Sequence, residues 1–265
     1  MDPTRKRRFK QQLFDQFARL GKALANNHRL ELVELLAQGE RSVESLAREA
    51  DLSVANASQH LQVLHRAGLV EQRRQGVFTY YSLTPGAFAL WQALRDLARQ
   101  RLAEVGRLES TLQREDEPVG LEELARRLER SDAVLLDVRP RREFEAGHIP
   151  GAIPAPVAEL EALLPSLPRG VEVIAYCRGP YCTFADEAVE LLRARGFNAR
   201  RLELGLPDWR AAGYPVRQGV GARSCASTST PSPPSARPTC WVAAARQSTR
   251  WAPSRPTWRT PSAWA

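Results

Sequence analysis

The chain of 265 residues has few cysteines and no long apolar segment. No apolar run approaches the roughly 20 residues of a membrane-spanning helix, and the N-terminal stretch MDPTRKRRFK lacks the apolar centre of a signal peptide. We therefore expect a cytoplasmic protein with no membrane partner. In that compartment thiols stay reduced, so pairing among the four cysteines would indicate redox or catalytic chemistry rather than a structural disulfide.

Acidic residues are absent from the C-terminal part of the sequence. Residues 217–265 contain seven Arg and no Asp, Glu or Lys, whereas the rest of the chain has 31 basic and 30 acidic side chains. The net charge of +8 therefore says little about DNA binding, which must be argued from local features. Residues 217–265 are rich in Ser, Thr, Pro and Trp, and we interpret them as a disordered low-complexity tail, either an unselected extension or a linker, without an assigned function.

The length predicts two modest domains, and the periodicity of residues 1–113 predicts mostly helices. Leucines at helical spacing between residues 20 and 36 end at Gly39, and Ser42 is placed to cap a helix over 43–50. A short turn at 51–53 leads into a second helix over 54–68. We then predict a β-hairpin with a turn at 73–76, followed by one long helix over 85–113. This order is that of a winged helix-turn-helix with a hairpin wing.

The helix over 54–68 has an apolar and a polar face. Val54, Ala57, Leu61 and Leu64 fall on one side at about 100° per residue, and polar side chains fall on the other. Asn and Gln suit adenine, while Arg suits guanine or phosphate, although a solvated helix face would have the same pattern. The candidate DNA-binding residues are Ser53, Asn56, Ser58, Gln59, His60, Gln62, Arg66, Arg73 and Arg74.

The stretch LSVANASQHLQVLHRAGLVEQRRQGVFTYYSL, within residues 20–83, resembles the ArsR family of winged-helix repressors. The resemblance implies a homodimer formed through the first and last helices of this domain, and binding of a double-stranded DNA operator with an inverted repeat. Metal-sensing members often have Cys or His on the helix before the turn or on the last helix, and neither occurs here. We therefore expect no metal ligands, and interpret His28, His60 and His65 as caps, packing residues or DNA contacts.

Short apolar strands alternate with helices over residues 121–216, after a linker at 114–120. Strands are expected at 133–138, 153–156 and 171–176, with helices at 121–129, 157–164, 184–196 and 208–213. This alternation predicts a second domain of the α/β class with a parallel sheet.

The stretch AYCRGPYCTFADEA, residues 175–188, places a cysteine at the end of the strand over 171–176. Ligands of open α/β sheets bind at the carboxyl ends of the strands, and loop amides before a helix lower a thiol pKa. Cys177 is thus the candidate catalytic thiolate, with Arg178, Gly179, Pro180 and Tyr181 as the active-site loop. Cys182 is either a small packing residue or a resolving thiol; a zinc site would need two further ligands, such as Cys225 and Cys240.

The stretches LLDVRPRREFEAGHIPGAIPAP and LGLPDWRAAGYPV, with this loop between them, resemble a single rhodanese domain over 121–216. The resemblance implies that Cys177 accepts sulfane sulfur as a persulfide. Rhodaneses that use thiosulfate commonly have a basic residue where this chain has Cys182, and related phosphatases have Arg where it has Thr183. The first departure disfavours thiosulfate as a substrate, and the second disfavours phosphate-ester hydrolysis. Four residues of this stretch are interpreted as scaffold rather than catalytic: Asp137, Arg139, Glu143 and His148.

Together these patterns predict a transcriptional repressor whose rhodanese domain senses or processes a small sulfur donor or another thiol-reactive effector, without a cofactor. Two alternatives stay open. One is a sulfurtransferase or a thiol-redox enzyme, including one that assists arsenate reduction, whose DNA-binding domain is autoregulatory. The other is an inactive rhodanese fold that serves only as an interaction module.

Overall fold

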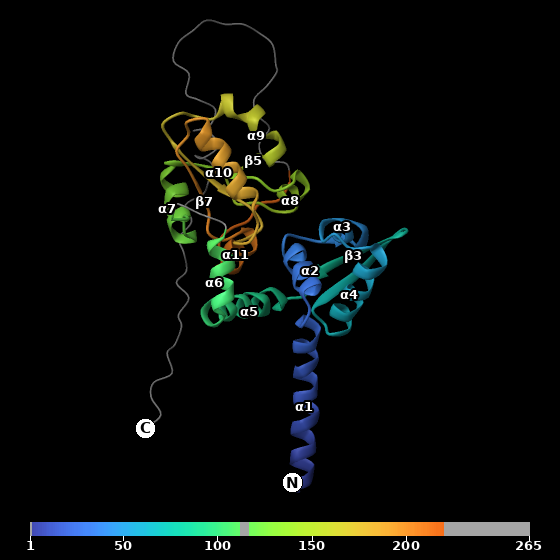
Figure 1. Ribbon diagram of the computed structural model, residues 1–265. Coiled ribbons are helices and arrows are strands. Elements are labelled where there is room, and N and C mark those ends of the chain that lie inside the picture. Colours follow the sequence, from blue (N-terminus) through green and yellow to red (C-terminus); the bar gives the residue numbers. More distant parts are fainter. Residues whose placement is uncertain (1, 112–116, 220–265) are drawn as a thin grey trace, which may run out of the picture. The chain divides into compact units, whose positions relative to one another are not determined.

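Helices and a small antiparallel sheet form the first domain of the computed structural model, which describes residues 2–111 and 117–219 (Figure 1). Its helices are α1 (Pro3–Leu24), α2 (Asn27–Ala37), α3 (Val43–Glu49), α4 (Val54–Arg66), α5 (Ala87–Arg101) and α6 (Ala103–Ser110). The strands β1 (Arg41–Ser42), β2 (Val70–Gln75) and β3 (Phe78–Leu83) pair antiparallel in the order β1-β3-β2. The prediction for the tail lies outside the described residues from 220 onward.

Side-chain caps begin the two helices of the helix-turn-helix. The Ser42 hydroxyl accepts a hydrogen bond from the Ser45 amide at 3.3 Å at the start of α3. The Ser53 hydroxyl accepts one from the Asn56 amide at 3.2 Å at the start of α4. Each cap satisfies an amide that has no partner within its helix, so these helices begin where the sequence predicts.

Two predicted boundaries in this domain are wrong. The hairpin turn lies at Gly76 and Val77 rather than at 73–76, because Gly76 adopts the positive φ of 59° that a tight two-residue turn needs. Arg73 and Arg74 therefore lie within β2. The long helix is divided at Leu102, which has an extended backbone, and the apolar periodicity that continues across it gave no sign of the break.

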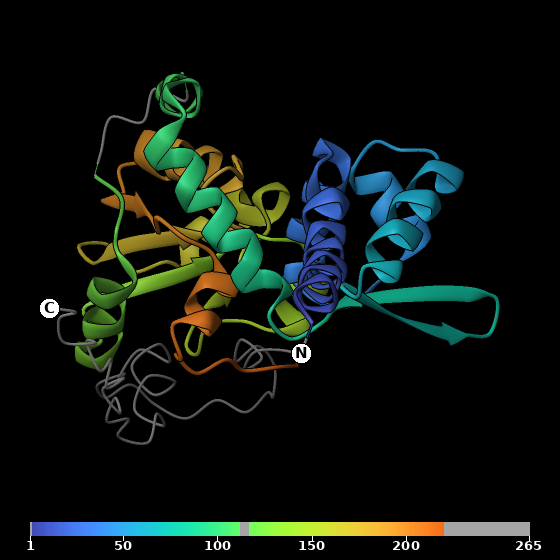
Figure 2. The same ribbon diagram turned by 90° about the horizontal axis from the view of Figure 1, so that it is seen from below.

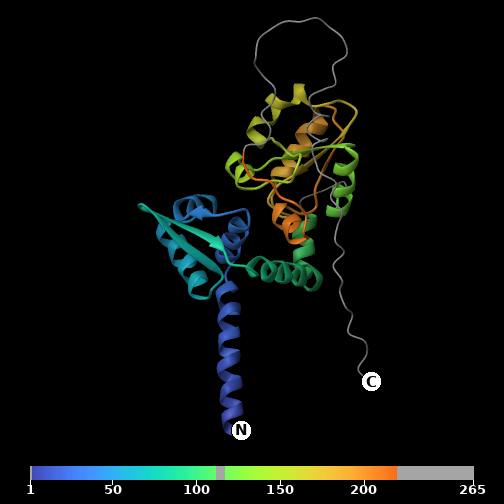
Figure 3. The same ribbon diagram turned by 180° about the vertical axis from the view of Figure 1, so that it is seen from behind.

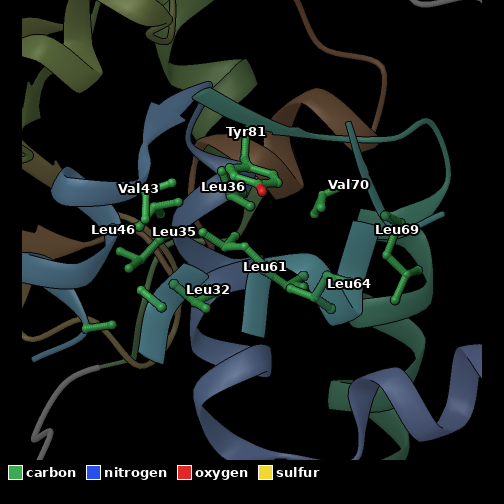
Figure 4. Close-up of a cluster of buried hydrophobic side chains, with 14 of the residues drawn as sticks. Leu32, Leu35, Leu36, Val43, Leu46, Leu61, Leu64, Leu69, Val70 and Tyr81 are labelled. Carbon is green, nitrogen blue, oxygen red and sulfur yellow. The ribbon is translucent and has the colours of Figure 1, made fainter. Parts of the chain in front are cut away.

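The apolar face of α4 packs into the centre of the first domain. Leu61 and Leu64 point toward Leu32 of α2 and Tyr81 of β3 (Figure 4). Val54, which the wheel placed on this face, is 49% exposed instead, because it lies in the first turn, beyond the packed part of α4. The buried residues of α4 are Ala57, Leu61 and Leu64, and the opposite face is open to solvent, as the polar pattern predicts.

A four-stranded parallel sheet with helices around it forms the second domain, and Figures 2 and 3 show it from two further sides. The strands β4 (Ala133–Asp137), β5 (Ile153–Pro154), β6 (Glu172–Tyr176) and β7 (Ala199–Arg201) have the order β5-β4-β6-β7. The helices are α7 (Leu121–Arg130), α8 (Arg141–Ala146), α9 (Val157–Leu163), η1 (Leu164–Ser166), α10 (Phe184–Ala194) and α11 (Leu206–Ala211). The predicted fold class is confirmed, although the short strands β1 and β7 were not predicted.

Both faces of the parallel sheet are buried. Leu136 and Ala175 belong to one apolar cluster, and their strand neighbours Leu135 and Ile174 belong to another. Since successive side chains of a strand point to opposite faces, β4 and β6 contribute to a core on each side. This double burial explains why the two strands are continuously apolar in sequence.

The first and second domains belong to one compact unit, Met1–Gly221. Within the described residues, no helix is both long and apolar enough to cross a membrane.

Candidate functional site

Strand β6 ends directly before Cys177, and α10 begins at Phe184, so the predicted thiol loop spans the gap between them. Cys177 is only 4% exposed, while Cys182 is half-buried, and neither forms a disulfide. The Cys177 sulfur lies within hydrogen-bond range of the main-chain oxygens of Gly179 at 3.6 Å and Cys182 at 3.3 Å. The loop thus folds back over its first residue and brings the two cysteines together.

A hydrogen bond joins the two thiols, and it shifts their pKa values in opposite directions. The bond with Cys182 and burial raise the pKa of Cys177 well above its usual value. The same bond from Cys177 lowers the pKa of Cys182 to about 7, with help from the nearby Arg178 charge. In this reduced state the two pKa shifts favour the negative charge on Cys182, which accepts the hydrogen bond, whereas the loop and the following helix predict it on Cys177.

Arg178 forms ion pairs with two acidic side chains. Its guanidinium donates to Glu143 at 2.6 and 3.1 Å and to Glu49 of α3 at 2.7 Å. Burial raises the pKa of Glu143, but hydrogen bonds from Arg178 and Arg41 outweigh it, and the net pKa lies below the usual value. The cation of the loop is thus neutralised by carboxylates.

A glycine of the second domain fixes the main chain of the loop from one side. A methyl group on Gly205, the residue before α11, would lie 2.2 Å from the Arg178 carbonyl oxygen and 2.8 Å from the Gly179 nitrogen. No side chain fits in that space. Sequence analysis did not single out Gly205, because only the packing of two distant segments makes it necessary.

Asp137 and Arg139 form a fully buried ion pair behind the site. Arg139 donates to the Asp137 carboxylate at 2.6 and 2.9 Å, and Tyr176 donates to the same carboxylate at 2.6 Å. The Tyr176 hydroxyl also accepts from the Ile149 amide at 3.1 Å. These groups satisfy one another, which agrees with the scaffold interpretation of Asp137 and Arg139.

His148 and Glu143 differ in what they contact. The His148 ring stacks on Phe144 at 3.8 Å between centroids, and burial lowers its pKa. Such a ring is part of the core, as interpreted. Glu143 instead contacts the thiol loop through Arg178, so its scaffold role extends to the site itself.

The second candidate site is the outer face of α4. Asn56, Gln59, Gln62 and Arg66 are exposed there, and Ser58 is half-buried. Ser53 caps the helix, and half-buried His60 lies 5.6 Å from the ring of His28, where burial lowers its pKa. The structure therefore brings four of the candidates together on an accessible polar surface, while Ser53 and His60 have local partners of their own.

Arg73 and Arg74 lie exposed on the wing strand β2. The Arg73 guanidinium donates to Glu40 at 2.6 and 2.9 Å and lies over the Tyr80 ring at 5.0 Å from its centroid. Glu40 thus competes with any phosphate for this side chain. Arg74 has the freer position of the two.

In the part of the chain that the structure describes, no group of three or more His, Cys, Asp or Glu side chains is arranged to hold a metal ion. Cys225 and Cys240, the additional ligands considered for zinc, lie outside that part.

Comparison with known proteins finds two families along the chain. Residues 26–72 match "Bacterial regulatory protein, arsR family", and residues 120–212 match "Rhodanese-like domain". The chain is 43% identical over 210 residues to the HTH-type transcriptional regulator Rv0324 of Mycobacterium tuberculosis, a match that covers 78% of this chain and 93% of that one.

Two solved structures are similar to separate parts of the chain. The homodimeric winged helix-turn-helix DNA-binding domain of Mb0332 from Mycobacterium bovis is 44% identical, covering 35% of this chain and 87% of that one, with a TM-score of 0.34. A rhodanese-related protein from Thermoplasma volcanium is 27% identical, covering 38% of this chain and 98% of that one, with a TM-score of 0.35.

Proposed function

Because the chain belongs to the arsR family of bacterial regulatory proteins and contains a rhodanese-like domain, we propose that this transcriptional regulator responds to sulfane sulfur at Cys177. The observation that supports this most directly is the hydrogen-bonded pair of Cys177 and Cys182 at the end of β6. Such a pair can take up a sulfur atom and then release it. Both steps require reduced thiols, as in the cytoplasm.

The first step is transfer of one sulfur from a hydropersulfide, RSSH. The Cys177 sulfur attacks the terminal sulfur of the donor while its proton passes along the shared hydrogen bond to the Cys182 thiolate. The donor S–S bond breaks and RS⁻ leaves, so that Cys177 becomes Cys–S–SH and Cys182 becomes a thiol. The pKa of about 7 makes Cys182 a suitable proton acceptor near neutral pH.

The second step is resolution by Cys182. After its proton is lost to solvent, the Cys182 thiolate attacks the inner sulfur of the Cys177 persulfide and expels HS⁻. The product is a Cys177–Cys182 disulfide, so over both steps RSSH is reduced to RSH and H₂S while two thiols are oxidised. The neutralised Arg178 offers no free charge to a dianion, which favours hydropersulfides over thiosulfate.

For DNA binding, we propose that the protein forms a homodimer that contacts an operator through α4 and the wing. Exposed apolar side chains support a dimer surface on the two helices that the family uses: Phe9, Phe14 and Phe17 on α1, and Leu90, Leu94 and Leu97 on α5. Gln59 and Asn56 would contact base edges, and Arg74 would contact phosphate. The matched domain from Mycobacterium bovis is homodimeric by its description, which agrees with this arrangement.

Intact-protein mass spectrometry with polysulfide tests the sulfur chemistry. We expect Cys182→Ser to gain one sulfur atom, wild type to proceed to loss of two hydrogens, and Cys177→Ser to do neither. Sulfur gain that does not require Cys177 would contradict the proposal. An unchanged mass in all three proteins would leave the rhodanese domain without the proposed chemistry.

A further inference from the structure

The thiol loop is in contact with the DNA-binding domain through its main chain. Gln38, which follows α2, donates from its side-chain nitrogen to the Arg178 carbonyl oxygen at 3.0 Å. Its side-chain oxygen accepts from Arg139 at 3.1 Å. Gln38 is 1% exposed, so both ends of one buried amide are used to join the first domain to the second.

A second contact joins the Arg178 side chain to the last residue of α3. Glu49 accepts from Arg178 at 2.7 Å and from Arg41 at 2.7 Å, and it also pairs with Arg142. Glu143 belongs to the same cluster, because it pairs with Arg41 of the first domain and with Arg178 of its own domain. The pair of Arg178 and Glu49 is 15% and 11% exposed, so solvent screens it little.

The Arg178 peptide is therefore held by two contacts. Gln38 hydrogen-bonds its carbonyl oxygen, and Gly205 packs against the same atom so closely that no methyl group fits between them. A shift of this peptide changes its hydrogen bond to Gln38 or its packing against Gly205. The position of the loop and the position of the first domain are coupled at this peptide.

Glu49 lies close to the start of the DNA-contacting helix. A turn of four residues separates it from Val54, the first residue of α4, and the Leu52 amide in that turn hydrogen-bonds to the Ala47 carbonyl of α3 at 2.8 Å. The buried faces of α3 and α4 pack through Leu46 and Leu61. A displacement of α3 is thus transmitted to α4 by packed side chains.

We propose that Gln38 and Glu49 are positioning residues that couple the chemical state of the Cys177 loop to the orientation of α4. This inference rests on the proposed function. Cys177 is buried, so an added sulfur atom needs space, and a bond between Cys177 and Cys182 shortens the distance between the two ends of the loop. Either change moves Arg178 and weakens the bond of its carbonyl oxygen to Gln38 and of its guanidinium to Glu49.

The test compares full-length wild type with Gln38→Ala and Glu49→Gln. Glu161→Gln is the matched control, since Glu161 pairs with Arg195 at 2.6 Å on the exposed surface of the second domain. A duplex selected from a random-sequence pool serves as operator. Its Kd is measured for each protein before and after polysulfide treatment. Mass spectrometry verifies that the persulfide or the Cys177–Cys182 disulfide has formed, and thermal unfolding verifies folding.

We expect polysulfide to change the Kd of wild type and of the control by roughly fivefold or more, within the usual range of allosteric coupling. In Gln38→Ala and Glu49→Gln the change should fall toward onefold although Cys177 still forms the persulfide or the disulfide. Because coupling is reciprocal at equilibrium, saturating operator should change the ratio of modified to reduced wild type by the same factor at a fixed ratio of polysulfide to thiol, and should not change that ratio in the two variants. A merely structural contact would not produce this reciprocal effect.

Three outcomes would overturn the inference. If folded variants that have formed the persulfide or the disulfide respond like wild type, neither residue couples the two sites. If wild type is modified in this way but its Kd is unchanged, no coupling exists to be transmitted. If wild type forms neither the persulfide nor the disulfide, the proposed function itself fails, and the mass spectra identify this case. Because the two variants alter different contacts, misfolding of one leaves the other to decide.

Discussion

Replacing Gly205 by Ala is expected to displace the thiol loop. The new methyl group would lie 2.2 Å from the Arg178 carbonyl oxygen and 2.5 Å from its carbon, far inside van der Waals contact. Both atoms are main chain, so no side chain can rotate away. Overpacking of this kind costs about 2–3 kcal/mol of unfolding free energy and should lower the Tm by roughly 4–10 °C.

Gly120→Ala provides the control for this substitution. Gly120 also precedes a helix of the second domain and also has a negative φ, but nothing lies within 4 Å of its added methyl group. The difference between the unfolding free energies of the two variants, measured by chemical denaturation, therefore gives the cost of the steric clash at Gly205. Sulfur loading of Cys177 in Gly205→Ala should also slow by roughly 10- to 100-fold, because the loop geometry is altered. Equal stabilities and equal loading rates for the two variants would refute the packing argument.

Three further predictions follow from the site and the wing. In wild type, the rate of alkylation by iodoacetamide should rise through pH 7, near which Cys182 loses its proton. In Cys182→Ser the midpoint of this pH profile should move above about 8.5, and an unchanged profile would contradict the hydrogen bond between the two thiols. Arg139→Leu should lower the unfolding free energy in urea by roughly 3–5 kcal/mol, because Asp137 is left buried and unpaired; a loss below about 1 kcal/mol would contradict this. Arg74→Ala should weaken DNA binding about equally for all sequences and reduce the salt slope by about 1, whereas a sequence-dependent loss would indicate a base contact.

The fold could be predicted from the sequence because its main elements have strong local patterns. Ser42 and Ser53 precede apolar helix faces, and the continuously apolar strand before Cys177 is typical of a parallel sheet buried on both sides. The polar residues 73–76 predict a turn, but the turn lies later, because Gly76 supplies the positive φ that a tight turn needs. Periodicity is thus a better guide to element type than to element ends.

The thiol loop could be located from sequence, but its surroundings could not. Gln38, Glu49 and Gly205 contact the loop from segments far away in the chain, and none has a local pattern that marks it. The sequence pattern predicts the thiolate at Cys177, whereas the pKa shifts favour it at Cys182. A loop and a following helix favour a thiolate in general, whereas the relative pKa of Cys177 and Cys182 depends on burial and on a hydrogen bond that only the folded loop forms.

Sulfur transfer to Cys177 is proposed to change how the protein binds DNA. The most direct test is the Kd of wild type and Cys177→Ser for one selected duplex, measured by fluorescence anisotropy with reduced protein and again after polysulfide. The account predicts a change of roughly fivefold or more in wild type, reversed by reduction with dithiothreitol, and no change in Cys177→Ser. Equal responses of the two proteins would contradict it.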